Sequence, residues 1–172
     1  MIIVGIDPGI INLGFAVYNT DTKCFLSFGK IDLTENVDKK TKTKYAHLVK
    51  NVIDGRQDIF GNLDHIAIEN QMIAKMKTIA TSFQIFFWKK SHMISPRALR
   101  CHFGISTGNY KSNKKASIEI IAKLPISREN IDLFNSYPDK KKDDAADAML
   151  IALYYAQKLQ EPAKRPQKRQ KK

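Results

Sequence analysis

The chain has 172 residues and a mass of 19.6 kDa, and 43% of its residues are hydrophobic and 27% charged. This composition fits one globular domain and excludes collagen-like, wholly disordered and disulfide-scaffold proteins. The charge is unusual, because 29 Lys and Arg residues against 17 Asp and Glu residues give a formal net charge of +12. Such an excess predicts a polyanionic partner, of which nucleic acid is the leading candidate.

Half of this net charge lies at the C-terminal end. Six of the ten residues from 163 to 172 are basic and none is acidic. We predict that residues 1–160 form the folded domain and that residues 161–172 form a basic, disordered tail that contacts phosphates without regard to sequence. A nuclear import signal and a solubilising end are the alternatives for the tail.

Cysteine, histidine and hydropathy patterns restrict the class further. Cys24 and Cys101 are far apart and lie among apolar residues, which predicts two buried thiols rather than a disulfide or a zinc site. The four histidines show no metal-ligand spacing and are predicted to be structural or surface residues. The longest apolar run, Ala148–Ala156, is much shorter than the ~20 residues that a membrane span needs. We expect a soluble, intracellular protein with no membrane partner.

Apolar runs predict five strands. The first three are separated by short polar or turn-forming segments, which is typical of an antiparallel meander, and the last two alternate with helices. In chain order, the strands are expected at residues 1–6, 13–18, 24–31, 63–68 and 92–95.

Helices are predicted where apolar residues recur at helical spacing. Ser127 is a candidate N-cap, Pro96 ends the last strand, and Gly104–Asn113 is predicted to be a loop because it has two glycines and few apolar residues. The last helix is apolar nearly all round, which indicates that it is buried. The helices are expected at residues 45–53, 72–88, 114–124, 127–134 and 143–159.

Four carboxylates stand at the ends of hydrophobic elements. Asp7 ends the first strand and Glu69 ends the fourth, and the carboxyl edge of parallel strands is where α/β folds bind ligands. Asp144 and Asp147 are three residues apart and therefore share one face of the last helix, whose alanines allow a close approach to the sheet. We expect the four side chains to cluster.

Such a cluster of like charges needs a cation, and an all-oxygen set of ligands suits Mg²⁺ or Mn²⁺. Two ions roughly 3.5–4 Å apart would activate a water molecule and stabilise the leaving oxygen of a phosphodiester. Each signal also has another explanation. The aspartates from 143 to 147 would serve as caps of the last helix, and the Gly5–Gly9 turn would suit the phosphate site of an actin-type ATPase.

Three stretches, IIVGIDPGIINLGFAV, IAIENQMIAK and DDAADAMLIA, together resemble the RuvC-type Holliday junction resolvases, a branch of the ribonuclease H-like superfamily. The resemblance spans about the first 155 positions. It implies an α/β, ribonuclease H-like fold, in which a five-stranded mixed sheet of an antiparallel meander plus parallel strands is flanked by helices. The run at 139–144 and the loop at 109–115 are similar to those of resolvases from poxviruses and other large DNA viruses, whereas the opening GIDPG is more similar to bacterial or phage members. A viral protein would act in the cytoplasm or nucleus of an infected host cell.

The resemblance also implies catalytic and metal-binding roles. Asp7 would bridge two metal ions, and Glu69 and Asp144 would each complete the coordination sphere of one ion. Asp147 would complete or orient such a coordination sphere. The family has basic residues at the scissile phosphate, and the nearest counterparts here are Arg100 and Lys115, with Lys114 and Lys111 as rivals. Lys115 is our candidate catalytic lysine. Family members carry an aromatic residue where this chain has Met72. The candidate DNA contacts are Lys75, Lys77, Arg100, Lys111, Lys114 and Lys115, for which a solvated surface is the alternative.

We therefore expect a structure-selective endonuclease, with two Mg²⁺ ions per active site and Mn²⁺ as a substitute. It would resolve four-way DNA junctions by paired symmetric nicks in DNA recombination, replication and repair. No small-molecule substrate is expected. The two-fold symmetry of a junction favours a homodimer, and the aromatic residues from Phe83 to Trp88 would supply apolar surface for it, with helix core as the alternative. The rival functions are a nuclease of the same fold for forks, flaps or RNA–DNA hybrids, a non-catalytic basic nucleic-acid-binding protein, and an actin-type ATPase.

Overall fold

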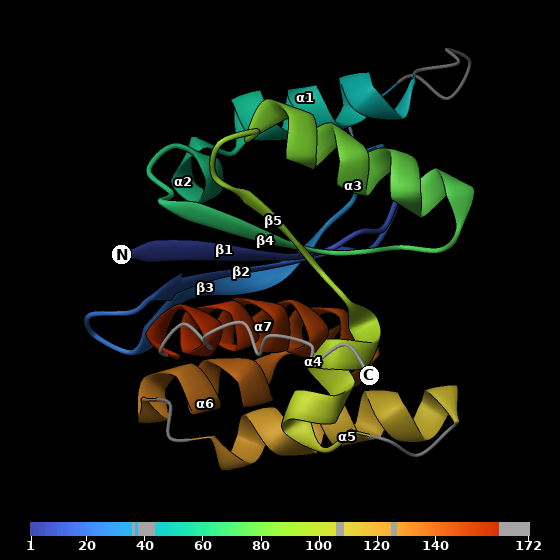
Figure 1. The fold of residues 1–172 in the computed structure, drawn as a ribbon. Coiled ribbons are helices and arrows are strands. Elements are labelled where there is room, and N and C mark those ends of the chain that lie inside the picture. Colours follow the sequence, from blue (N-terminus) through green and yellow to red (C-terminus); the bar gives the residue numbers. More distant parts are fainter. Residues whose placement is uncertain (36, 38–43, 106–108, 125–126, 162–172) are drawn as a thin grey trace, which may run out of the picture.

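A five-stranded mixed sheet in the order β3-β2-β1-β4-β5 lies between two layers of helices (Figure 1). The computed structural model describes residues 1–35, 37, 44–105, 109–124 and 127–161. Strands β1, β2 and β3 form an antiparallel meander, and β4 and β5 continue the sheet parallel to β1. The strands are β1 (Ile2–Asp7), β2 (Leu13–Asn19), β3 (Cys24–Ile31), β4 (His65–Glu69) and β5 (Ser91–Ile94). All five predicted strands and the mixed topology are confirmed.

The helices divide between the two faces of the sheet. Helices α1 (Tyr45–Gly55), α2 (Gln57–Phe60) and α3 (Ala74–Phe86) cover one face. On the other face α7 (Asp139–Gln160) lies directly against the sheet, and α4 (Pro96–Phe103), α5 (Tyr110–Lys123) and α6 (Arg128–Ser136) form an outer layer (Figure 1). Within the described ranges, every helix is too short or too polar to serve as a transmembrane span.

Each face of the sheet has its own apolar core. One core joins the sheet to α1 and α3, with Ile79 and Phe83 fully buried. The other core joins the sheet to α7, which approaches closely because small residues face each other. A Cβ on Gly5 of β1 would lie 2.3 Å from the carbonyl oxygen of Ala148 and 2.8 Å from the amide nitrogen of Ala152. The alanine-rich start of the last helix therefore has the packing role that the sequence predicted.

The structure corrects several predicted boundaries. The sequence does not predict α4, because Pro96 ends the preceding strand. Pro96 instead occupies the first turn of a helix that Ser95 caps by accepting a hydrogen bond from the Ala98 amide at 3.4 Å. Helix α5 begins at Tyr110 rather than at 114, so the predicted loop is shorter. The predicted N-cap Ser127 is confirmed, since it accepts a hydrogen bond from the Asn130 amide at 3.2 Å.

Helix α7 begins four residues earlier than predicted, at Asp139, and its N-cap residue is Pro138, with no side-chain cap. Asp144 and Asp147 therefore lie inside the helix and do not cap its first turn. The prediction of two buried thiols is wrong, because Cys101 is exposed on α4 and Cys24 is half-buried, and both are free. The predicted tail, apart from Glu161, lies outside the described residues.

Candidate active site

The four predicted carboxylates line one cleft of about 320 Å³ at the carboxyl edge of the parallel strands. Strands β1 and β4 are paired in parallel so that Ile6 lies beside Ile68. The next residue of each strand, Asp7 in β1 and Glu69 in β4, is its last. Asp144 and Asp147 reach the same cleft from α7. Three separate elements thus bring four acids to one place.

Gln71 links the two acids at the strand ends. Its Nε2 atom donates hydrogen bonds to Asp7 Oδ1 at 3.2 Å and to Glu69 Oε2 at 2.6 Å. Burial raises the pKa of Asp7 well above its ordinary value, and the charge of Glu69 adds to the rise. Burial also raises the pKa of Glu69, against the opposing effects of its hydrogen bonds and of Arg100. Sequence reasoning missed Gln71, although it stands only two residues after Glu69.

The two acids of α7 also have pKa values above their ordinary values. Burial raises the pKa of Asp147 to about 6; a hydrogen bond with Ser117 opposes the rise, and repulsion from Glu69 adds to it. Burial and the neighbouring Asp143 raise the pKa of Asp144, while Lys114 and Lys30 oppose the rise. Four carboxylates with raised pKa values in one cleft are the arrangement that a bound cation would stabilise.

Lys114, rather than Lys115, faces this cleft. Its ammonium group forms an ion pair with Asp143 and lies 3.8 Å from Asp144 Oδ1. The Lys115 side chain is 80% exposed, does not line the cleft, and lies 3.7 Å from Glu119 Oε1 of the next helical turn. The two lysines diverge because successive residues on a helix point about 100° apart. The side chain of Lys111 lies outside the described residues.

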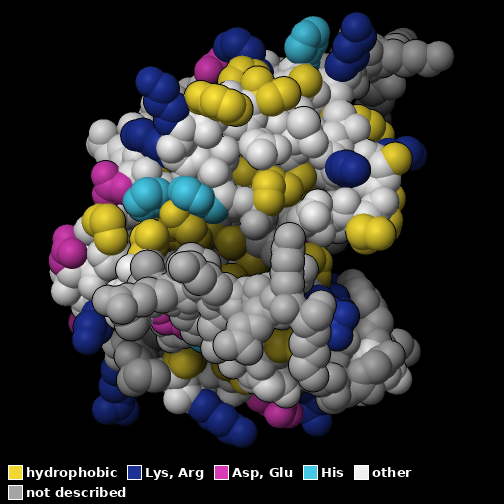
Figure 2. Space-filling model, viewed as in Figure 1, with side chains coloured by type: hydrophobic (Ala, Val, Ile, Leu, Met, Phe, Trp, Pro, Cys, Tyr) yellow, Lys and Arg dark blue, Asp and Glu magenta, His cyan; other side chains and the backbone are white. Residues whose placement is uncertain are grey.

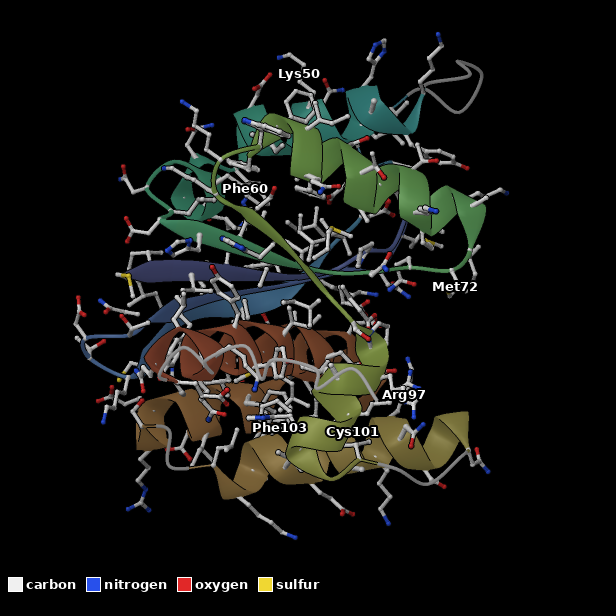
Figure 3. The ribbon with its side chains drawn as sticks, in the orientation of Figure 1. Lys50, Phe60, Met72, Arg97, Cys101 and Phe103 are labelled. Atoms are coloured by element: carbon white, nitrogen blue, oxygen red, sulfur yellow. The ribbon has the colours of Figure 1, made fainter. Side chains whose placement is uncertain are left out.

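The other predicted DNA contacts differ in whether they line the cleft. Arg100 of α4 lines the cleft, and its charge opposes the rise in the pKa of Glu69. Lys75 and Lys77 are exposed on α3 and are not part of the cleft wall. Figure 3 places Met72 and Arg97 at the same end of the molecule, on the chain segments that follow β4 and β5. Met72 is 92% exposed.

Residues 1–160 of the chain match the family described as Poxvirus A22 protein. The chain belongs to this family. No curated protein matches it.

Solved structures of junction resolvases share the fold of this A22-family protein. The complex of fowlpox virus resolvase with its substrate Holliday junction DNA superposes with a TM-score of 0.69 at 24% identity and covers 94% of this chain and 100% of the resolvase. A second structure of the fowlpox virus Holliday junction resolvase superposes with a TM-score of 0.63 at 25% identity. It covers 92% of this chain and 99% of the resolvase. The yeast mitochondrial Holliday junction resolvase Ydc2 superposes with a TM-score of 0.66 at 18% identity. The match covers 90% of this chain and 78% of Ydc2. The RuvC-type, viral resemblance and the ribonuclease H-like fold are thereby confirmed.

RuvC-like resolvases depend on divalent metal ions, and the cleft of this A22-family protein has suitable donors. Within the described ranges, no three His, Cys, Asp or Glu side chains are arranged to hold a metal ion as they stand. The chemistry of the cleft nevertheless fits such an ion, because its four carboxylates offer only oxygen and their charges repel one another. In the structure the Gln71 amide, the Lys114 ammonium group and the Ser117 hydroxyl are among the hydrogen-bond donors that contact these acids.

Proposed function

We propose that this A22-family protein is a divalent-metal-dependent endonuclease that resolves four-way DNA junctions by paired symmetric nicks. The observation that carries the proposal is the convergence of Asp7, Glu69, Asp144 and Asp147 on one cleft in a chain with a net charge of +12. The fowlpox virus resolvase, which shares the fold over its whole length, was solved with a Holliday junction as its substrate.

We assign the metal ligands to the four carboxylates and favour two Mg²⁺ ions, for which Mn²⁺ would substitute. When bound, such ions activate the attacking water and stabilise the leaving oxygen of the phosphodiester. The burial of these carboxylates disfavours their charge in the absence of metal, so binding of an ion and loss of protons are coupled. Gln71 holds the first two ligands together through its hydrogen bonds to Asp7 and Glu69.

We transfer the role of the catalytic lysine from Lys115 to Lys114. Lys114 lines the cleft and already neutralises part of its negative charge, so it would contact the scissile phosphate when DNA enters. Lys115 points toward solvent and Glu119 and stays a candidate DNA contact.

The DNA path that we propose runs along the basic rims of the cleft. Lys75 and Lys77 are exposed on α3, and Arg97 and Arg100 are exposed on α4, on opposite sides of the carboxylates. Because these helices lie on opposite faces of the sheet, they would contact phosphates of two different arms or strands (Figure 1). Arg97 was not predicted from the sequence.

We also propose a homodimer. Phe83 is buried and Phe87 is half-buried against the core, and both rings pack on Phe60. Phe86 and Trp88 are exposed by 45% and 76%, and Ile85 by 67%, which leaves apolar surface at the end of α3. A two-fold contact there would present two active sites to one junction. As a viral protein, it would act in the cytoplasm or nucleus of an infected cell.

The decisive experiment is cleavage of a synthetic four-way DNA junction in Mg²⁺, with linear duplex, a Y-fork and an RNA–DNA hybrid in the same reaction. Paired symmetric nicks confined to the junction are expected. Asp144→Asn should abolish cleavage and keep junction binding, whereas the exposed Asp132→Asn on α6 serves as the matched control. Preferential cleavage of the fork or hybrid would contradict the junction assignment, and binding without cleavage would indicate a non-catalytic DNA-binding protein.

A further inference from the structure

Two histidines and a tyrosine meet at the end of the sheet opposite to the carboxylate cleft. His65 begins β4, His92 lies on the edge strand β5, and Tyr155 lies on α7. The His65 Nδ1 and His92 Nε2 atoms are 3.2 Å apart, and the Tyr155 hydroxyl oxygen is 3.4 Å from the same Nδ1 atom. Figure 2 shows histidine side chains side by side on the molecular surface at the level of these strands.

The Nδ1 atom of His65 has more polar neighbours than it can bond at one time. The Nδ1 atom of a neutral imidazole has either one proton or one lone pair, so it forms one good hydrogen bond. The His65 Nδ1 atom nevertheless faces two polar atoms, one from His92 and one from Tyr155. The ring of His92 also stacks on that of Tyr155, with centroids 4.4 Å apart and planes inclined by 26°, which orients both groups.

The separations of the His65 Nδ1 atom from the two other donor atoms match those around a single metal ion. Two ligands at 2.0–2.1 Å from a tetrahedral zinc ion stand roughly 3.3–3.4 Å apart. The two measured separations, 3.2 Å and 3.4 Å, are close to this value. The two histidines are only half-buried, so water would be able to complete the coordination.

We propose that His65, His92 and Tyr155 form a second metal site that takes a transition-metal ion such as Zn²⁺. Imidazole nitrogen selects zinc-like ions, whereas the all-carboxylate cleft suits Mg²⁺, so the two sites differ in their preferred metal. They are also well separated, because Tyr155 lies eleven residues after Asp144 on α7, roughly 16 Å along the helix axis. The ion would join β4, the edge strand β5 and α7.

Zinc titration of the full-length protein in excess Mg²⁺, followed by calorimetry, tests the proposal while Mg²⁺ occupies the carboxylates. One Zn²⁺ per chain should bind the wild type, and His65→Gln and His92→Gln should each weaken binding at least tenfold. His102→Gln is the matched control, because His102 is not part of the cluster. Its Nε2 atom forms a hydrogen bond with Gln157 Oε1 at 2.5 Å. The affinity of His102→Gln should stay within twofold of the wild type.

A second measurement needs no variant. In ¹⁵N NMR spectra of the wild-type imidazoles, Zn²⁺ should shift the His65 Nδ1 and His92 Nε2 resonances and leave those of His47 and His102 in place. No zinc binding by the wild type, equal affinity in all three variants, or stationary His65 and His92 resonances would each overturn the proposal.

Discussion

A Cβ atom on Gly14 would lie 2.4 Å from the backbone carbonyl oxygen of Asp144. The same atom would lie 3.3 Å from the Cβ of Asp7, which pairs with Gly14 across strands β1 and β2. The missing side chain of Gly14 therefore sets how closely the carboxylates of the sheet and of α7 approach each other.

Gly14→Ala should displace the start of α7 and separate Asp144 from Asp7. The contact is with backbone, which has little freedom to move, so we expect a loss of about 1–3 kcal/mol in the free energy of unfolding. Junction cleavage should fall about tenfold or more, since about an ångström of displacement at a catalytic group has effects of this size or larger. The measurements are urea unfolding and single-turnover cleavage. Gly55→Ala is the control, because a Cβ there meets nothing within 4 Å; equal behaviour of the two variants would refute the prediction.

Lys114→Ala and Lys115→Ala should differ sharply. Loss of Lys114 removes the cation next to Asp143 and Asp144, and we expect single-turnover cleavage to fall by about 10²–10³. Loss of Lys115 removes an exposed charge and should change junction affinity only slightly. The reverse order of effects would return the catalytic role to Lys115.

The metal-free protein should lose stability as the pH rises from about 4 to about 6. Burial raises the pKa of Asp147 to about 6 in the folded state, above its ordinary value in the unfolded chain. In that window the folded state binds more protons than the unfolded state, so the free energy of unfolding falls as pH rises, by on the order of 3 kcal/mol. Burial raises the pKa values of Asp7 and Asp144 as well, and both act in the same direction.

This effect is measured by urea unfolding at several pH values in the presence of a metal chelator. The wild type is compared with Asp147→Asn. The variant should show a shallower decline, and excess Mg²⁺ should reduce the decline of the wild type because the ion favours ionised carboxylates. Identical pH profiles of the two metal-free proteins would mean that burial does not raise the pKa of Asp147.

Deletion of residues 163–172 should weaken junction binding and reduce its salt dependence. The segment holds six basic residues. If all six contact phosphates, the slope of log K against log salt should decrease in magnitude by about five. Affinities measured between 50 and 300 mM salt give the slope. An unchanged slope would exclude the tail from the DNA interface.

Local sequence patterns were enough to predict the acids of the candidate site. Asp7 and Glu69 follow buried β-branched runs, and Asp144 and Asp147 stand at helical spacing among alanines. Strand direction and helical period are properties of short segments, so the convergence of these residues followed once β1 and β4 were taken as parallel neighbours. The five strands and the buried last helix were predictable for the same reason.

Only the tertiary structure decided which neighbours of these acids face the cleft. Lys114 and Lys115 are adjacent in the sequence, and the choice between them depends on where α5 begins and how it lies against α7. The meeting of His65 with Tyr155 joins residues 90 positions apart and has no local signal. Sequence patterns encode the period and ends of single elements, whereas contacts between elements arise from packing, which a few small residues such as Gly14 control.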